Sequence, residues 1–206
     1  LQAMLQQAQA ESGGLVEAFE YMPPSYMRRL SEVRPDVAQP FDHQHGTTIL
    51  VELGASAPAL CTPLADGSVP LTTLLETALA ARIETGQVLD AVVAQSETQR
   101  RAMWQRRELA AEITFARSPA IDTDVALPLD KVATFLAAVT ARITALDPEA
   151  ETLAVGHLGD GNVHYTVFPT RETAAHKDRI LQAIEDEVQA LRGSFSAEHG
   201  VGLSKL

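Results

Sequence analysis

The segment Glu151-Thr-Leu-Ala-Val-Gly-His-Leu-Gly-Asp-Gly-Asn-Val-His-Tyr-Thr-Val-Phe168 decides the fold of this chain, because it predicts a β-hairpin. Asp160-Gly161 is typical of a two-residue type I′ turn, in which both positions need a positive φ. With this turn, His157 lies opposite His164. Directly opposed residues share a face, with Cβ atoms roughly 4.5–5.5 Å apart. The sequence therefore predicts two imidazoles close enough to bind one metal ion.

A second segment, Ala197-Glu-His-Gly-Val-Gly202, supplies a carboxylate and a third imidazole in a glycine-rich loop. Two histidines and one carboxylate with open coordination positions are the pattern of a catalytic metal site. Neighbouring residues point in opposite directions in extended chain, so Glu198 and His199 cannot both face the metal. We expect one of them to ligate the metal and the other to reach toward a substrate.

The same residue types have simpler interpretations. Paired histidines on a hairpin also occur as surface residues or as a hydrogen-bonded cross-strand pair, and Asp160 is expected to be a turn residue only. His43 and His45 could form a second metal pair, but a solvated loop is the preferred interpretation of that segment. His176, near the start of an expected helix, is predicted to lie at the surface.

Composition narrows the class of protein. The 206 residues fit one large domain or two small ones, and 46% hydrophobic residues are ample for a core. The net charge of -11 argues against binding to nucleic acid or to an anionic membrane. The sequence has no apolar run long enough for a transmembrane helix. Cys61 is the single cysteine, which excludes an internal disulfide and favours a cytoplasmic location.

Hydrophobic periodicity predicts alternating strands and helices. The expected strands are residues 15–21, 47–53, 88–94, 120–127, 151–157 and 163–168. Helices are expected to begin near Pro24, Leu71, Ser96, Asp130 and Thr170, and the helix from Ser96 is expected to continue to about Phe115. Because the hairpin is antiparallel, we predict an α+β fold: a mostly antiparallel sheet covered by helices, similar to ferredoxin-like units joined side by side.

The pattern H-x-G-D-G-N-x-H, followed roughly 30 residues later by S-x-S-A-E-H-G-x-G, resembles the C-terminal domain of FAD-linked oxidases of the vanillyl-alcohol oxidase type. The most similar branch is the D-2-hydroxyacid dehydrogenases, which include D-lactate and D-2-hydroxyglutarate dehydrogenases. Met103-Trp104-Gln-Arg-Arg107-Glu108 is similar to the family's tryptophan and Arg-Glu helix. Asp124-Val-Ala-Leu-Pro128 is similar to its D-x-S-x-P strand end. The resemblance covers residues 1–206 as one domain.

This resemblance implies roles for individual residues. His157, His164 and Glu198 would hold a divalent metal, zinc in the first place, with manganese and iron as alternatives. His199 would be the general base. A 2-hydroxyacid would chelate the metal, His199 would accept the hydroxyl proton, and a hydride would pass from C2 to the flavin to give a 2-oxoacid.

The resemblance also assigns the substrate side of the site. Arg107 would bind the substrate carboxylate as a bidentate pair, with Asn162 and Thr166 lining the same site. Three positions depart from the 2-hydroxyglutarate branch: Asp122 replaces a lysine, Ala111 a threonine, and Thr166 an asparagine. The charge reversal at Asp122 makes a dicarboxylic substrate doubtful, although Arg117 nearby could compensate.

The chain contains no dinucleotide-binding glycine fingerprint, so which of its residues touch FAD is open. The resemblance places the FAD-binding domain before Leu1 and a tail after Leu206. We therefore expect a domain fragment that is inactive alone. The apolar surface facing the flavin domain would then be exposed, which favours self-association as a homodimer.

Two alternatives remain open at this point. One is a non-catalytic binding or assembly domain in which the histidines are structural. The other is a self-contained metal-dependent hydrolase that uses the same three ligands to activate water, against which the absence of a second carboxylate near the site counts. The electron acceptor cannot be read from the sequence.

Overall fold

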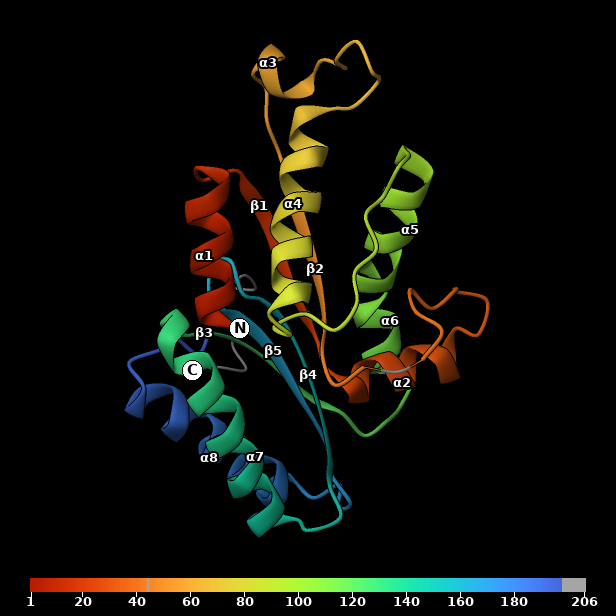
Figure 1. Ribbon diagram of the computed structural model, residues 1–206. Coiled ribbons are helices and arrows are strands. Elements are labelled where there is room, and N and C mark those ends of the chain that lie inside the picture. The colour runs from red at the N-terminus through yellow and green to blue at the C-terminus, as the bar shows by residue number, and fades with distance from the viewer. Residues whose placement is uncertain (44, 198–206) are drawn as a thin grey trace. The chain divides into compact units, whose positions relative to one another are not determined.

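The computed structural model describes residues 1–43 and 45–197 (Figure 1). The fold is α+β, and the predicted antiparallel sheet covered by helices is confirmed. The strands are β1 (Val16–Met22), β2 (Thr48–Leu53), β3 (Ile121–Ala126), β4 (Glu151–His157) and β5 (Asn162–Phe168). The helices are α1 (Gln2–Ser12), α2 (Pro24–Val33), α3 (Pro58–Cys61), α4 (Pro70–Glu84), α5 (Glu97–Glu108), α6 (Ala110–Phe115), η1 (Leu129–Lys131), α7 (Val132–Leu146) and α8 (Ala174–Ala190).

The strands form one sheet in the order β2-β1-β4-β5-β3. The chain divides into two compact units, and β1 and β2 each contribute residues to both. The first unit contains residues 1–19 and 50–104, and the second contains residues 20–49 and the chain from residue 105 onward. In the first unit, α1 packs against α4. Buried Arg82 of α4 pairs there with Glu11 of α1 at 2.9 Å.

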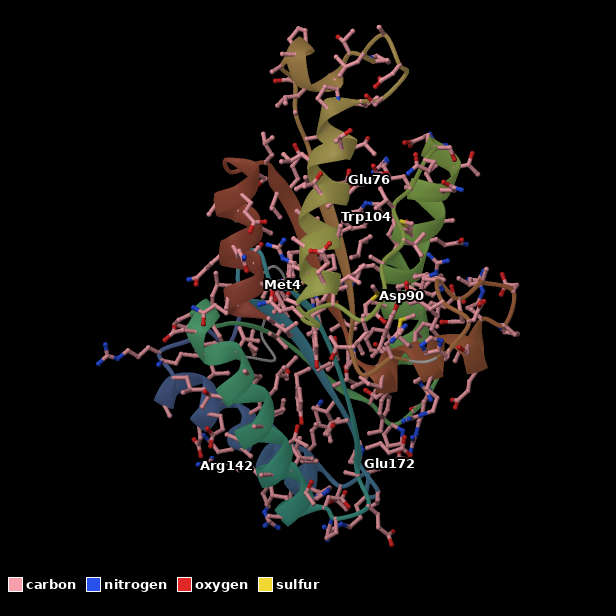
Figure 2. All side chains as sticks on the ribbon, in the orientation of Figure 1. Met4, Glu76, Asp90, Trp104, Arg142 and Glu172 are labelled. Carbon is pink, nitrogen blue, oxygen red and sulfur yellow. The ribbon has the colours of Figure 1, made fainter. Side chains whose placement is uncertain are left out.

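The second unit has its core between the sheet and the helices α7 and α8. Tyr165 of β5 is fully buried, meets the ring of Phe135 edge-on, and lies 3.1 Å from the Thr140 hydroxyl. Arg142 of α7, labelled in Figure 2, pairs with Asp186 and Glu187 of α8. Apolar side chains fill the layer: Val125, Phe135, Val139, Ile143, Val163, Val167, Ile180, Ile184 and Val188. This packing covers one face of the hairpin, and the other face carries His157, Asn162, His164 and Thr166 next to buried Leu153 and Val155.

Two predicted elements differ from the structure. Residues 88–94 are not a strand: the run is apolar, but Leu89 and Val92 are exposed and the segment has no strand pairing. A hydrophobic run alone does not supply the partner that a strand needs. The single helix predicted from Ser96 to about Phe115 is two helices, α5 and α6, because Leu109 leaves the helical backbone with φ -74° and ψ 1°.

His176 was predicted to lie at the surface, and this prediction is wrong. Its side chain is buried, with Nε2 2.9 Å from a carboxylate oxygen of Asp147. The amide and hydroxyl of Thr170 donate to the same carboxylate at 2.9 and 2.7 Å. Since Thr170 is used in this way, Thr173 caps α8 instead, accepting from the His176 amide. Burial alone would raise the pKa of Asp147, but hydrogen bonds from Thr170 and His176 outweigh it and lower the pKa to about 2.

We predict that Asp147→Asn lowers the free energy of unfolding by about 2 kcal/mol at pH 7, because it removes the charge from a buried hydrogen-bonded acceptor. An aspartate ionises near pH ~3.9 in the unfolded chain, so its depressed pKa stabilises the fold above about pH 4. That contribution is lost as the pH falls toward 2. Urea unfolding of both proteins at pH 7 and pH 3 should therefore show a smaller difference at pH 3.

Asp130→Asn is the matched control, because Asp130 is exposed and forms a surface ion pair with its neighbour Lys131. It should change stability by less than about 0.5 kcal/mol. An equal loss for Asp147→Asn at both pH values would contradict the proposed role of the charge.

Candidate active site

The hairpin forms as predicted, but its register differs from the prediction. His157 pairs with Asn162 and Val155 with His164, so residues 158–161 form the connecting loop. A type I′ turn at Asp160-Gly161 is excluded because only Gly161 has a positive φ, 76°. The pairing is shifted by two residues, and since side chains alternate with a period of two, every side chain keeps its predicted face.

The loop is fastened to the end of β3. The amide of Leu127 donates to the Gly161 carbonyl at 2.9 Å. A Cβ at Gly161 would overlap the carbonyl oxygen of Leu127. Glycine is thus required here for both its backbone conformation and its size.

Polar residues of four strands lie on the same face of the sheet. Glu20 of β1 is directly opposite His157 of β4, and Asp124 of β3 is directly opposite His164 of β5. Directly opposed residues share a face, so the two histidines and two carboxylates lie together. The rings of His157 and His164 are 5.7 Å apart between centroids and tilted by 79°. The predicted closeness of the two imidazoles is therefore confirmed.

Arg107 of α5 reaches this face and contacts His157 directly. Its Nη2 lies 2.9 Å from His157 Nε2, and its Nε donates to Glu20 Oε2 at 2.8 Å. Glu20 Oε2 also lies 2.7 Å from His157 Nδ1. Glu20 and Arg107 are both buried. The structure thus places Arg107 beside His157, while its predicted role in binding a substrate carboxylate stays a prediction. It also adds Glu20, which the sequence did not point to.

Glu20 has a sequence signal that would have suggested a buried role. It is a charged residue between two aromatic residues, Phe19 and Tyr21, in a mostly apolar strand. A buried carboxylate needs a charged or hydrogen-bonded partner. The identity of that partner could not be read from the sequence, because Arg107 follows 87 positions later.

Asp124 lies between His164 and the C-terminal segment. One carboxylate oxygen is 3.8 Å from His164 Nδ1, and the other accepts a hydrogen bond from the Ala197 amide at 3.3 Å. Ser194 forms a β-bridge with Ala126 through two backbone hydrogen bonds. The chain that leads to Glu198 and His199 is therefore held next to the histidine pair.

Glu198 and His199 lie outside the described residues, so their predicted roles as ligand and base are not tested. Within residues 1–43 and 45–197, no three histidine, cysteine, aspartate or glutamate side chains are arranged to hold a metal ion. The alternative metal pair, His43 and His45, has its rings 4.4 Å apart between centroids, but no third such side chain among the described residues completes a site there.

The substrate-side residues form two groups. Asn162 is buried next to the histidines on the polar face. Thr166 donates to Asp122 at 2.5 Å across β5 and β3. Arg117, which could have offset the charge of Asp122, instead pairs with Glu151 at 2.7 Å and lies over the Phe168 ring. Ala111, in α6, is exposed.

Residues 2–206 match the family described as FAD linked oxidases, C-terminal domain. The chain belongs to this family. The predicted resemblance is confirmed, and FAD is the cofactor that the family's name specifies.

Relatives of this FAD linked oxidase domain include three D-2-hydroxyglutarate dehydrogenases. The protein of Stutzerimonas stutzeri is 35% identical over 60% of this chain and 27% of its own length. The mitochondrial enzyme of Arabidopsis thaliana is 28% identical over 99% of this chain and 34% of its own length. The mitochondrial enzyme of Rattus norvegicus is 30% identical over 94% of this chain and 34% of its own length.

The chain thus spans about a quarter to a third of the length of these relatives. The relatives support the D-2-hydroxyacid dehydrogenase branch of the FAD linked oxidases, as expected from the two C-terminal motifs. Among the described helices of this domain, none has the length and apolar character needed to cross a bilayer.

We predict that Gly161→Ala destabilises the domain by about 2–5 kcal/mol. A left-handed backbone costs an L-residue roughly 1–2 kcal/mol, and crowding against the Leu127 carbonyl adds about 1–3 kcal/mol. Gly159→Ala is the control in the same loop, because nothing lies within 4 Å of its added Cβ. Urea unfolding of both variants measures the difference, and equal effects would refute the account of the loop.

Proposed function

We propose that this domain provides the substrate- and metal-binding part of a flavoprotein that oxidises a D-2-hydroxyacid to a 2-oxoacid by hydride transfer to FAD. The observation that supports it most is the His157–His164 pair with Arg107 against it, in a domain of the FAD linked oxidases. The names of the relatives support a hydroxyacid as the substrate class.

The residues fit a divalent cation. The rings of His157 and His164 are 5.7 Å apart between centroids, and the Glu20 carboxylate lies 2.7 Å from His157 Nδ1. A metal at His157 Nε2 would displace the Arg107 guanidinium, which lies 2.9 Å from this nitrogen. Two imidazoles are donors that zinc prefers, and manganese or iron are alternatives. We assign Glu198 as the third ligand. When bound, the metal would lower the pKa of the substrate hydroxyl.

The chain's own residues would then bind and orient the substrate. Arg107 offers N–H groups in a fixed planar fork, which suits a carboxylate. Asn162 carries an amide that can donate to a substrate oxygen from the same face. We assign His199 as the acceptor of the hydroxyl proton. Glu20, Arg107 and Asn162 are buried, whereas the side chains of His157 and His164 are 32% and 20% exposed and are therefore accessible to a substrate.

The charges around Asp122 of β3 and Thr166 of β5 favour a substrate without a second carboxylate. Asp122 brings a negative charge there and accepts a hydrogen bond from Thr166, while Arg117 is paired with Glu151. A distal carboxylate would be repelled by Asp122. We therefore propose a monocarboxylic D-2-hydroxyacid of the lactate type, in contrast to the substrate in the names of the three relatives described above.

Three further parts of the proposal rest on sequence alone. The single cysteine supports a cytoplasmic location. A homodimer and the absence of nucleic-acid binding also remain predictions. The electron acceptor is not assigned.

The metal is tested by elemental analysis of the full-length protein after mild dialysis. We predict one divalent ion per chain. The ion should be lost in His164→Ala, which removes one of the two proposed histidine ligands, and retained in His43→Ala, because His43 is not a proposed ligand. Stoichiometric metal in the His164 variant would refute this ligand assignment. A wild-type protein that stays metal-free after zinc, manganese or iron is added back would refute the metal site itself.

The substrate class is tested by Asp122→Lys. We predict that kcat/KM for D-2-hydroxyglutarate relative to D-lactate rises at least about tenfold, because one charged hydrogen bond contributes roughly 1.5–3 kcal/mol. Asp178→Lys is the control, since Asp178 is exposed on α8 and makes the same charge change. An unchanged ratio in Asp122→Lys would show that this position does not face the distal part of the substrate.

A further inference from the structure

His157 has a charged neighbour at each ring nitrogen. Glu20 Oε2 lies 2.7 Å from Nδ1, and Arg107 Nη2 lies 2.9 Å from Nε2. The two neighbours are also bonded to each other, because Arg107 Nε donates to the same Glu20 oxygen at 2.8 Å. The three side chains thus form a closed ring of contacts in which Glu20 and Arg107 are buried.

These neighbours determine which nitrogen of His157 carries the proton. A guanidinium has donors only, so Nε2 must accept from Arg107. A neutral imidazole has one acceptor and one donor nitrogen, so Nδ1 must donate to Glu20. The contacts therefore select the Nδ1–H tautomer and leave the lone pair on Nε2.

The Nδ1–H tautomer is the form that binds a metal through Nε2. Histidine ligands commonly donate their other N–H to a carboxylate, which fixes the ring orientation and raises the basicity of the ligating nitrogen. We propose that Glu20 is a positioning residue for the metal site, because it holds the His157 ring in the orientation and tautomer that a ligand bonding through Nε2 needs. This inference rests on the proposed function, since it assumes that His157 is a ligand.

Strand pairing fixes the position of Glu20 relative to His157. Glu20 and His157 are directly opposed across β1 and β4, so the sheet pairing sets their separation. The Asp124 oxygen nearest His164 Nδ1 is 3.8 Å away, longer than the contact between Glu20 and His157, and the proposal concerns Glu20 and His157.

The tautomer is tested directly in the metal-free full-length protein labelled with ¹⁵N-histidine. The imidazole nitrogen signals of His157 are assigned by their loss in His157→Gln. We expect Nδ1 to carry the proton and Nε2 to show the shift of an unprotonated nitrogen. Protonation of Nε2 instead would overturn the proposal, and this result would not depend on whether the protein binds metal.

The role in metal binding is tested by comparing Glu20→Met with Glu20→Gln. Both remove the negative charge, but glutamine keeps an acceptor within reach of Nδ1–H and methionine does not. We expect the Zn²⁺ dissociation constant, from competition with a chelating dye, to rise 10- to 100-fold in Glu20→Met. Glu20→Gln should recover most of this loss. Glu17→Gln, on an exposed side chain of the same strand, should match wild type.

The outcomes separate this inference from the proposed function. Zinc binding that is lost in His164→Ala but equal in Glu20→Met and Glu20→Gln would overturn the positioning role and leave the metal site intact. No zinc binding by the wild type would overturn the proposed function, while the nitrogen shifts would still decide the tautomer. Thermal unfolding of each variant shows whether Glu20→Met is folded. If it is not, the nitrogen signals of the wild-type protein still test the tautomer.

Discussion

The site depends on one constraint, which is that directly opposed residues on neighbouring strands share a face. This constraint brings Glu20 beside His157 and Asp124 beside His164, although the two carboxylates are far from the histidines in sequence. The opposite face of the hairpin is filled by Tyr165 and its neighbours against α7. The apolar core therefore fixes the position and orientation of the strands that carry the polar side chains of the site.

The positive and negative groups of the site stabilise one another in a buried environment. Arg107 and Glu20 would each be costly to bury alone, and their contact offsets part of that cost. In the proposed tautomer, His157 completes the arrangement by accepting a hydrogen bond from Arg107 and donating one to Glu20. Such a network gives a defined geometry more than net stability, which is what a ligand site requires.

Local periodicity was sufficient to predict the hairpin, the shared face of His157 and His164, and most of the helices. It failed where a partner distant in sequence decides the outcome. Residues 88–94 have the composition of a strand but no strand beside them, and His176 has the setting of a surface residue but is buried against Asp147. The turn register was mispredicted because Asp160 does not adopt the positive φ that its sequence context favours. The contact of Glu20 with Arg107 was also beyond prediction, since it joins a strand to a helix across a long stretch of chain.

The order of the proposed ligands along the chain has a consequence for biosynthesis. The histidine pair is complete once β5 has been made, because it belongs to a local hairpin. The segment leading to Glu198 and His199 follows only after α8, and it is tied back to Asp124 through the Ala197 amide. A ribosome would release the last proposed ligand and the proposed base after the rest of the site had emerged. Proteolytic cleavage between Ala197 and Glu198 would thus separate the proposed third ligand and the proposed base from the histidine pair of the hairpin.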